Sequence, residues 1–372
     1  MSRPLIVLAD DLTGAAEIAA IAHERGLRAV VISRLPTEPV DTDVLVIDTD
    51  TRLAKPPAAA RRLRAAVRRL KKFPHAGFFK KADSVLRGPV LAELLGSMQA
   101  LGSQRVVLVA GNPSLGRVIR NGQFFINGQP LDRTSFATDP HHPARTADVM
   151  ALLKPAKNIS VAYLPPVGPL PRTGVIVGEH RSAADTARWV RLLAPDTLAA
   201  GGADFFKAWL GAHSGRGRAP ATAPTPAEPG LLLHGTTAPA ANTRFLRFNG
   251  LRAPSAVRVA TALRLRGGAA VAATSLTASD PLAPAIIALN FARLARDLRD
   301  AQAFRHLLIA GGATAASVLR GLGWTRLEVV RVWAPGVVSL RPASAPALIV
   351  TLKPGSYAWP ATVRRSMPAV FT

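Results

Sequence analysis

The sequence predicts an α/β protein with two doubly wound domains, mainly parallel sheets and an active site in the cleft between the domains. Apolar runs of four to six residues alternate with helical patterns from residue 5 onward, which is typical of parallel sheets covered by helices. The proline-rich stretch 214–230 contains no large apolar residue and reads as a linker. The strand–helix alternation starts again after it. The predicted domains are therefore 1–213 and 231–372, joined by the linker 214–230.

Length and composition exclude several classes of protein. The 372 residues are enough for two cores, and a hydrophobic content of 48% excludes a disordered chain. The sequence has no cysteine, so it has no disulfides, thiolate metal sites or cysteine nucleophiles. It has no run of eighteen apolar residues, and its first apolar run is too short for a signal peptide. We expect a cytoplasmic protein that does not enter membranes.

A formal net charge of +24 raises the question of nucleic-acid binding. The densest basic run lies in a predicted helix over 57–72, where Leu63, Val67 and Leu70 recur at helical spacing. No aromatic residues interleave with these cations to stack on bases. Nucleic acid is therefore the less favoured partner, and small anions are the more favoured one. A homodimer is compatible with the sequence, which does not set the oligomeric state.

The first half contains five predicted strands, over 5–8, 28–32, 44–47, the run ending at Phe79, and 105–109. Further helices are predicted over about 12–26 and 89–101. Polar residues follow four of the strands: Asp10 and Asp11, Asp50 and Arg52, Lys80 to Arg87, and Asn112 with Arg117. Because the carboxyl ends of parallel strands meet at one edge of a sheet, we expect these residues to converge in a ligand cleft.

The stretch FFKKADSVLRG, over 78–88, carries the highest density of functional side chains. Three cations (Lys80, Lys81 and Arg87), the carboxylate of Asp83 and the hydroxyl of Ser84 lie where a strand becomes a helix. Taken alone, this stretch could be a charged surface loop. The other polar strand ends are what favour a binding site.

The remainder of the first half is less informative. The segment 120–149 is rich in glycine, asparagine and proline and is interpreted as an excursion on the substrate side, in which His141 and His142 favour a turn over a metal site. A strand over 175–177 precedes a helix through Trp189. Two glycines then precede a helix, a weak signal for an anion site.

The second half repeats the strand–turn–helix pattern. A strand over 231–234 leads to a polar turn over 235–237 and a helix, and a strand over 269–273 precedes a helix over 285–304. The strand before Gly311 leads through Gly312, Ala313 and Thr314 into a helix ending near Gly321. Such a turn can hold phosphate with backbone N–H groups and the helix dipole, although an ordinary tight turn remains the alternative. It lacks the Walker A and dinucleotide-binding spacings.

With these motifs assembled, the chain resembles the four-carbon acid sugar kinase family. The resemblance spans nearly the whole chain and is carried by ADDLTGAAE (9–17), DTDTR (48–52), KKADSVLRG (80–88), GNPSLGRVIRNG (111–122), FATDPHHP (136–143), IAGGATA (309–315) and the Lys-Pro-Gly at 353–355. It implies a kinase that transfers phosphate from ATP, with Mg²⁺, to a hydroxyl of threonate, erythronate or a 3-oxo-tetronate. It also implies that the first domain binds the sugar acid and the second binds ATP.

The resemblance and the residue chemistry together assign roles. Arg52, Lys81, Ser84 and Arg87 are expected to hold the substrate carboxylate, with Asp10 and Asn112 also binding substrate. Asp11 and Asp83 are alternative proton acceptors, and Lys80 is expected to face the transferred phosphoryl group. The expected ATP-binding residues are Thr236, Thr237, Gly311, Gly312, Ala313, Thr314, Gly336 and Gly355.

No residue is assigned as a dedicated metal ligand. From Leu231 onward there are only four acidic residues, so Mg²⁺ is expected to depend on the nucleotide phosphates, water and the first-domain aspartates. The second half departs from the family pattern, for example with Ala313 after the double glycine. A catalytically weak sugar-acid sensor is therefore the alternative function, ahead of a nucleic-acid-binding protein.

Overall fold

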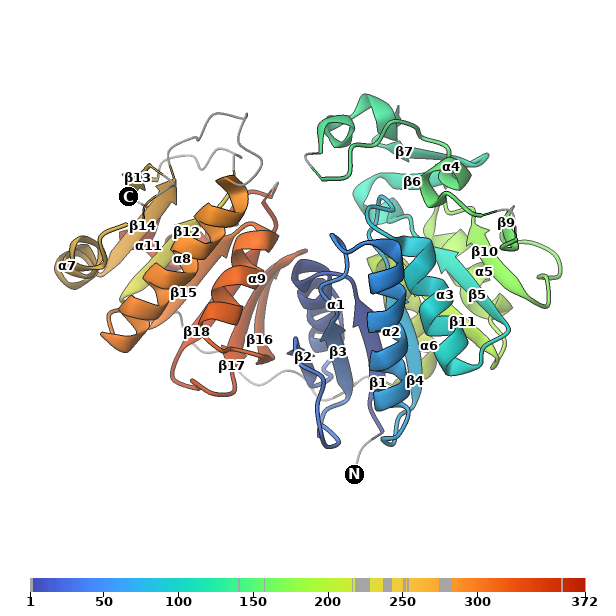
Figure 1. Ribbon diagram of the computed structural model, residues 1–372, viewed down its shortest axis with the longest axis horizontal. Helices are drawn as coiled ribbons and strands as arrows, with labels where there is room; N and C mark the ends of the chain where they lie inside the picture. The colour runs from blue at the N-terminus through green and yellow to red at the C-terminus, as the bar shows by residue number, and fades with distance from the viewer. Residues whose placement is uncertain are drawn as a thin grey trace. The chain divides into compact units, whose positions relative to one another are not determined.

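The computed structural model describes the chain except residues 1–2, 140, 157, 216, 218–227, 237–242, 250–251, 253, 274–282, 356 and 372. Two compact units are formed, one from Met1–Leu27 and Leu35–Arg218 and the other from Arg28–Arg34 and Ala219–Thr372 (Figure 1). Most of the expected linker lies outside the described residues. The second unit thus includes a short N-terminal segment that the sequence had placed in the first domain.

The first unit is built on a seven-stranded parallel sheet. Its strands, in spatial order, are β3 (Val44–Asp48), β1 (Leu5–Ala9), β4 (Gly77–Lys81), β11 (Thr197–Gly201), β5 (Arg105–Val109), β10 (Gly174–Gly178) and β9 (Val161–Leu164). Nearly every residue of the central strands is buried, as expected where helices cover both faces of a parallel sheet.

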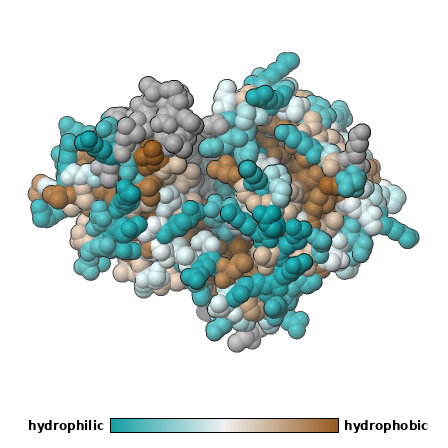
Figure 2. Space-filling view, in the orientation of Figure 1, coloured by the Kyte–Doolittle hydropathy of each residue, from teal (hydrophilic) through white to brown (hydrophobic). Residues whose placement is uncertain are grey.

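The helices of the first unit are α1 (Leu12–Glu24), α2 (Pro56–Leu70), α3 (Val90–Leu101), α4 (Val149–Leu153), α5 (Ala183–Leu192) and α6 (Ala203–His213). α2 packs against α3, and α6 packs against both α1 and α5. Leu63, Val67 and Leu70 of α2 are buried as predicted, and hydrophilic residues cover its outer side (Figure 2).

Between β5 and β9 the chain leaves the parallel sheet. β6 (Arg117–Arg120), β7 (Gln123–Ile126) and β8 (Gln129–Pro130) form a small antiparallel sheet, followed by short 3₁₀ turns and α4. This is the segment that the sequence identified as an excursion. Its Asn- and Gly-containing turns, such as Asn121-Gly122 at positive φ, suit two-residue hairpins.

The second unit has an eight-stranded mixed sheet. Its strands, in spatial order, are β13 (Phe245–Phe248), β14 (Gly268–Ala273), β12 (Gly230–His234), β15 (His306–Ala310), β18 (Ile349–Lys353), β17 (Val337–Pro342), β16 (Arg326–Ala334) and β2 (Ala29–Ile32). The first five are parallel. β18, β17, β16 and β2 pair in antiparallel fashion.

The helices of the second unit are α7 (Ala256–Arg266), α8 (Ala283–Asp300), α9 (Gly312–Gly321), α10 (Ala361–Ser366) and α11 (Pro368–Phe371). α8 packs against α9. Trp359, Val363 and Phe371 near the C-terminus join Leu232 and Leu308 of the sheet in one apolar core. No helix of the described part of the chain is long and apolar enough to cross a membrane.

Three expectations about elements were wrong. Residues 245–248, expected to be helical, form β13; the alternation Phe-Leu-Arg-Phe fits a strand paired on one side. β2 pairs with β16 of the second unit, with Val31 opposite Leu327. β4 continues through Lys80 and Lys81, which the sequence had placed in the following loop.

Candidate functional site

The strand ends predicted to carry function do meet at one edge of the first unit. Ala9, the last residue of β1, lies beside Asp48 of β3 and Lys81 of β4, and Lys81 lies beside Gly201 of β11. In this register Asp10, Arg52 and Asp83 all follow the carboxyl ends of adjacent strands. This edge is where open α/β sheets bind ligands.

Arg52 joins the three aspartates of this edge. Its Nε donates to Asp10 Oδ2 at 2.7 Å and its Nη1 to Asp11 Oδ2 at 2.6 Å, while its Nη2 lies 3.3 Å from Asp83 Oδ2. Asp11 is also the N-cap of α1, accepting the Gly14 N–H at 2.9 Å. One guanidinium thus contacts three carboxylates.

Asp83 organises the loop that follows β4. Its Oδ1 accepts the backbone N–H groups of Val85 and Arg87, both at 3.1 Å. The Arg87 guanidinium pairs with Asp83 at 2.8 Å and with Asp139 of the excursion at 3.0 Å. Leu86 has a φ of 62°, a left-handed conformation that costs energy for leucine. The Asp83 hydrogen bonds on both sides hold that strained turn.

Burial and these ion pairs act in opposite directions on the carboxylates. Burial acts to raise the pKa of Asp10, but Arg52 and Lys80 outweigh it and hold that pKa below its usual value. Burial likewise opposes Arg52 and Arg87 at Asp83, whose pKa is strongly lowered. Both aspartates are therefore ionised at neutral pH.

Asp48, at the end of β3, behaves differently. Burial, followed by the negative charge of Asp11, raises the pKa of Asp48 to about 7, although Asp48 accepts the Asp50 N–H at 3.0 Å. No cation pairs with it among the described residues. The edge therefore contains a carboxyl group that titrates near neutrality next to carboxylates that do not.

The two lysines of the opening motif lie elsewhere than expected. Because they end a strand, their side chains point to opposite faces. Lys80 is completely buried and pairs with the buried Glu93 of α3 at 2.9 Å, so its ammonium is held in the interior, and its role toward a phosphoryl group stays a prediction. Lys81 is 3% exposed, with Glu17 of α1 at 3.5 Å. Burial raises the pKa of Glu93, against the opposing effect of Lys80.

Two buried polar atoms at this edge have no hydrogen-bond partner among the described residues. They are Oδ1 of Asp10 and Nδ2 of Asn112. Asn112 is held by its other end, where Oδ1 accepts the Asp204 N–H of α6 at 3.1 Å. Leaving a buried polar atom unpaired costs about 1–3 kcal/mol, so these two atoms are candidates for ligand contacts.

The excursion adds residues to the same edge. Arg117 donates to the Ser84 hydroxyl, and the Phe136 ring lies 5.3 Å from the Arg87 guanidinium and 5.7 Å from that of Arg117. His142 Nε2 lies 2.9 Å from the Arg52 carbonyl oxygen. The backbone N–H groups of His141 and His142 both donate to Asp139 Oδ1, at 3.0 and 2.9 Å. No group of three metal-ligating side chains occurs in the described ranges.

The second unit brings three turns together at the carboxyl ends of β12, β15 and β18. The Gly235 N–H bonds to Ala310 O and the Gly311 N–H to Lys353 O, both at 2.9 Å. Gly311 is the N-cap of α9 at a φ of 108°. A Cβ on Gly311 would lie 2.7 Å from Gly235 O, and one on Gly235 would lie 1.9 Å from Thr314 Oγ1. A side chain at either position would collide with the neighbouring turn, so glycine allows these turns to pack closely.

The remaining nucleotide-site predictions gather around Lys353. Its ammonium donates to the carbonyls of Pro354 at 2.8 Å, Gly355 at 3.2 Å and Tyr357, and burial lowers the pKa of Lys353 to about 8. A Cβ on Gly355 would lie 2.9 Å from Thr236 Oγ1, and one on Gly336 would lie 2.9 Å from the Tyr357 ring.

Other predicted nucleotide-site residues differ in their accessibility. Gly312 begins α9, Ala313 is exposed and Thr314 is buried. Thr237 lies outside the described residues. The roles of these residues in nucleotide binding stay predictions.

Sequence reasoning missed Glu93 and Glu17, the partners of the two lysines. Glu93 is in the first turn of α3, where an acidic residue is ordinary because it complements the helix dipole. Only the burial of Lys80 would have indicated that a carboxylate must face it. The buried cations of β4 thus explain both glutamates.

Comparison with known proteins identifies the two units. A sugar-binding N-terminal domain family matches residues 5–193, and a nucleotide-binding C-terminal domain family matches residues 251–357. Similar solved structures include a Haemophilus influenzae protein, at TM-score 0.73 and 20% identity over 99% of this chain and all of that one. A Salmonella typhimurium protein described as a putative tRNA synthase has TM-score 0.75 and 20% identity, covering 96% of both chains. At this identity they confirm the α/β fold alone.

Several curated relatives are sugar-acid kinases by name. A D-erythronate kinase of Heliobacterium modesticaldum is 31% identical over 43% of this chain and 38% of its own length. A D-threonate kinase of Salmonella typhimurium is 35% identical over 40% and 36%. The matched segment thus spans less than two fifths of these relatives. A 3-oxo-tetronate kinase of Cupriavidus necator is 26% identical over 96% of this chain and 95% of its own. With both domain families matched in order, the chain belongs to the four-carbon acid sugar kinase family.

Proposed function

We propose that the protein is a kinase that transfers a phosphoryl group from ATP to a hydroxyl of a four-carbon sugar acid. Family membership and the names of its relatives support the reaction class. The observation that carries the proposal is the Arg52 cluster, with two unpaired buried polar atoms close to the same sheet edge. Such a site suits a small ligand that offers both a carboxylate and hydroxyl groups.

The sugar acid would be held by cations and by the unpaired atoms. Arg52 supplies a guanidinium, and the Ser84 hydroxyl with Arg117 supplies a second group of donors. Asp10 Oδ1 would accept from a substrate hydroxyl, and Asn112 Nδ2 would donate to an oxygen. The Lys81 ammonium lies next to the first turn of α1, because a Cβ placed on Gly14 would be only 3.6 Å from its Nζ. Lys81 therefore contributes positive charge to this edge.

Asp11 is the better of the two proton acceptors. Asp83 is bound by Arg52, Arg87 and two backbone N–H groups, and its pKa is strongly lowered. A carboxylate so stabilised is a weak base. Asp11 has the more exposed side chain. We assign to Asp11 the role of the base that accepts the proton of the attacking hydroxyl. Asp83 instead holds the conformation of the loop after β4.

The glycine turns of the second unit fit a nucleotide. ATP, when bound, supplies the phosphoryl group. Gly235 and Gly311 let these turns pack closely before α9, whose first-turn N–H groups could then bind phosphate oxygens. The aspartates of the first unit are largely occupied by Arg52. Mg²⁺ would therefore depend mainly on phosphate oxygens and water.

The test is an ADP-release screen of the full chain against D- and L-threonate, D- and L-erythronate and 3-oxo-tetronates. ADP release dependent on one of these acids supports the proposal. Binding of an acid by calorimetry without ADP release would instead favour the sensor, an alternative for which Ala313 at the start of α9 argues. Neither binding nor turnover with any of the acids would refute both.

A further inference from the structure

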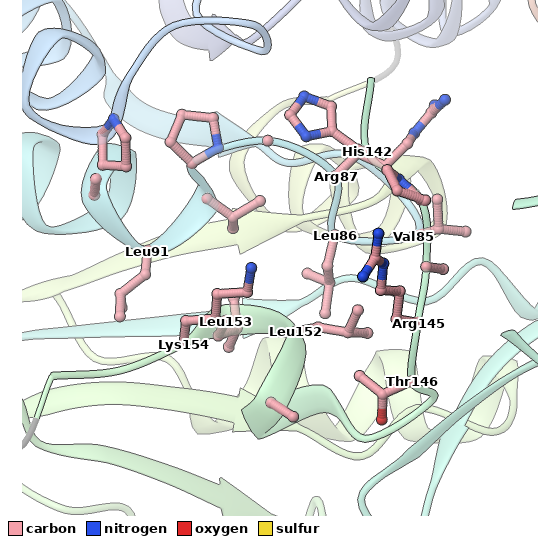
Figure 3. A pocket seen from close by; sticks show the side chains of 18 of the residues that line it. Val85, Leu86, Arg87, Leu91, His142, Arg145, Thr146, Leu152, Leu153 and Lys154 are labelled. Atoms are coloured by element: carbon pink, nitrogen blue, oxygen red, sulfur yellow. The ribbon is translucent and has the colours of Figure 1, made fainter. Parts of the chain in front are cut away.

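A cavity of about 680 Å³ lies in the first unit, next to the loop that Asp83 organises. One wall is the segment 85–92, which leads from the Asp83 loop into α3. The opposite wall is the segment 141–159, which includes α4 (Figure 3). None of the three aspartates that Arg52 contacts lines it, and its volume falls within the roughly 300–1,000 Å³ typical of small-molecule sites.

The cavity walls are mostly aliphatic. The larger apolar side chains that line it include Leu86, Val90, Leu91, Leu95, Leu152 and Ile159. Leu86 and Leu91 come from the α3 side, and Leu152 from the α4 side (Figure 3). Apolar walls of this kind select a ligand with a hydrocarbon body.

Among the described residues, the ionisable side chains that line the cavity are arginine, lysine and histidine. The lining includes Arg87, Arg145 and Lys154, and no aspartate or glutamate. Arg87 is already paired with Asp83 and Asp139. Arg145 and Lys154 are exposed to solvent, and their side chains make no hydrogen bond or ion pair within the described part of the chain. Their charged ends extend from the Leu152–Leu153 side toward the segment that carries Leu86 and Leu91 (Figure 3). Two cations without partners therefore face an apolar space.

The N-terminus of α3 adds positive potential. Gly88, Pro89 and the first residues of α3 line the cavity, and α3 spans twelve residues. The first turn of a helix favours negative charge. This effect and the two free cations act in the same direction.

We propose that this cavity binds a small amphipathic anion, a carboxylic acid with an aliphatic body, and that Arg145 and Lys154 hold its carboxylate. Two cations beside apolar walls fit one negative charge better than a polyphosphate. The aliphatic body would lie against Leu86, Leu91 and Leu152. The inference does not depend on the kinase activity proposed above.

The probe is octanoate, titrated into the full chain by calorimetry, with octanamide and acetate as matched probes. Octanamide keeps the body and removes the charge; acetate keeps the charge and removes the body. We expect octanoate to bind with a stoichiometry of one and at least about tenfold more tightly than either analogue, since each lacks one half of the recognition. Equal affinity for octanamide, or weak binding of octanoate at many sites, would overturn the proposal.

Variants place the binding in this cavity. Arg145→Gln/Lys154→Gln should weaken octanoate binding by about tenfold or more, whereas Arg133→Gln, an exposed arginine outside the lining, should leave it unchanged. Ala151→Trp keeps both cations and fills space at the lining, so it should also weaken binding. Circular dichroism confirms that each variant is folded. If the filled and the uncharged variants both bind octanoate like the parent, the assignment is wrong.

Discussion

Asp11 has the most exposed side chain of the three aspartates that Arg52 contacts, at 20% against 2% for Asp10 and 5% for Asp83. If it accepts the substrate proton, Asp11→Asn should lower kcat by roughly 10²–10⁴-fold. The helix should survive, because asparagine caps α1 as well as aspartate does. Steady-state kinetics with the best sugar acid measures the effect, and Asp196→Asn, at an exposed position, is the control. Full turnover by Asp11→Asn would exclude it as the base.

Asp48 makes stability depend on pH in an uncommon direction. Its pKa is about 7 in the folded chain and about 3.9 in an unfolded one, so between these values the folded state binds more protons. Its contribution to stability is therefore retained below about pH 4 and lost as the pH rises toward 7. Asp48→Asn mimics the neutral form. At pH 8 the variant should exceed the parent in unfolding free energy by on the order of a few kcal/mol.

Urea denaturation of the parent and of Asp48→Asn at pH 4, 6 and 8 measures this difference. The two curves should nearly coincide at pH 4 and separate as the pH rises. A constant difference at all three pH values would mean that Asp48 does not titrate in this range. Asp196→Asn, at an exposed aspartate, should follow the parent throughout.

At the scale of elements, β4 and α3 are joined by an ion pair inside the core. Lys80 and Glu93 are both almost fully buried, and the Thr51 hydroxyl also donates to Glu93. Lys80→Met should lower the unfolding free energy by about 3–5 kcal/mol, because it leaves a buried carboxylate without its partner. Adding Glu93→Gln should recover much of that loss. Lys55→Met, at an exposed lysine, is the control; no recovery in the double variant would argue against charge as the cause.

The turn between β15 and α9 makes a second prediction at this scale. Gly311→Ala adds a Cβ 2.7 Å from a backbone oxygen, at a φ of 108°, and should weaken ATP binding by at least about tenfold while sparing sugar-acid binding. Gly323→Ala is the matched control, since Gly323 also has positive φ but nothing within 4 Å of its Cβ. Calorimetry with ATP and with a sugar acid separates the two effects. Unchanged ATP affinity in a folded Gly311→Ala would remove the phosphate role from this turn.

For the whole molecule, the sequence predicted those features that depend on neighbouring residues in the chain. The runs before Asp10 and Asp48 are strands, as predicted. They could be predicted because the length of an apolar run and the polar residues after it are both visible in the sequence. Lys80 was predicted to lie in the loop after β4, because a lysine in a sequence usually marks the point where a buried strand ends. It lies in the core instead because it pairs with Glu93, thirteen residues later. Which carboxylates Arg52 contacts follows from sheet register, which no local pattern contains.

The largest error at this scale was to place β2 in the first domain, whereas it pairs with β16 of the second unit. This pairing leads to a prediction about fragments. A fragment of residues 219–372 lacks β2, so β16 becomes an unprotected edge. It should self-associate, whereas the same fragment carrying residues 28–34 through a Gly/Ser linker should be monomeric by analytical ultracentrifugation. Val31→Pro within the added strand removes a ladder N–H and serves as the control. A monomeric and equally stable 219–372 would show that β2 is dispensable.

The pairing of β2 with β16 also sets an order of events during synthesis. About 300 residues separate Val31 from Leu327, so at 5–20 residues per second β2 leaves the ribosome roughly 15–60 s before its partner. The apolar AVVI segment must wait through that interval without its β16 partner, while the strands on either side of it in the sequence can already begin to assemble. The second unit therefore completes its sheet only when nearly the whole chain has been made, and a prematurely released chain would expose β2 to other proteins or to chaperones.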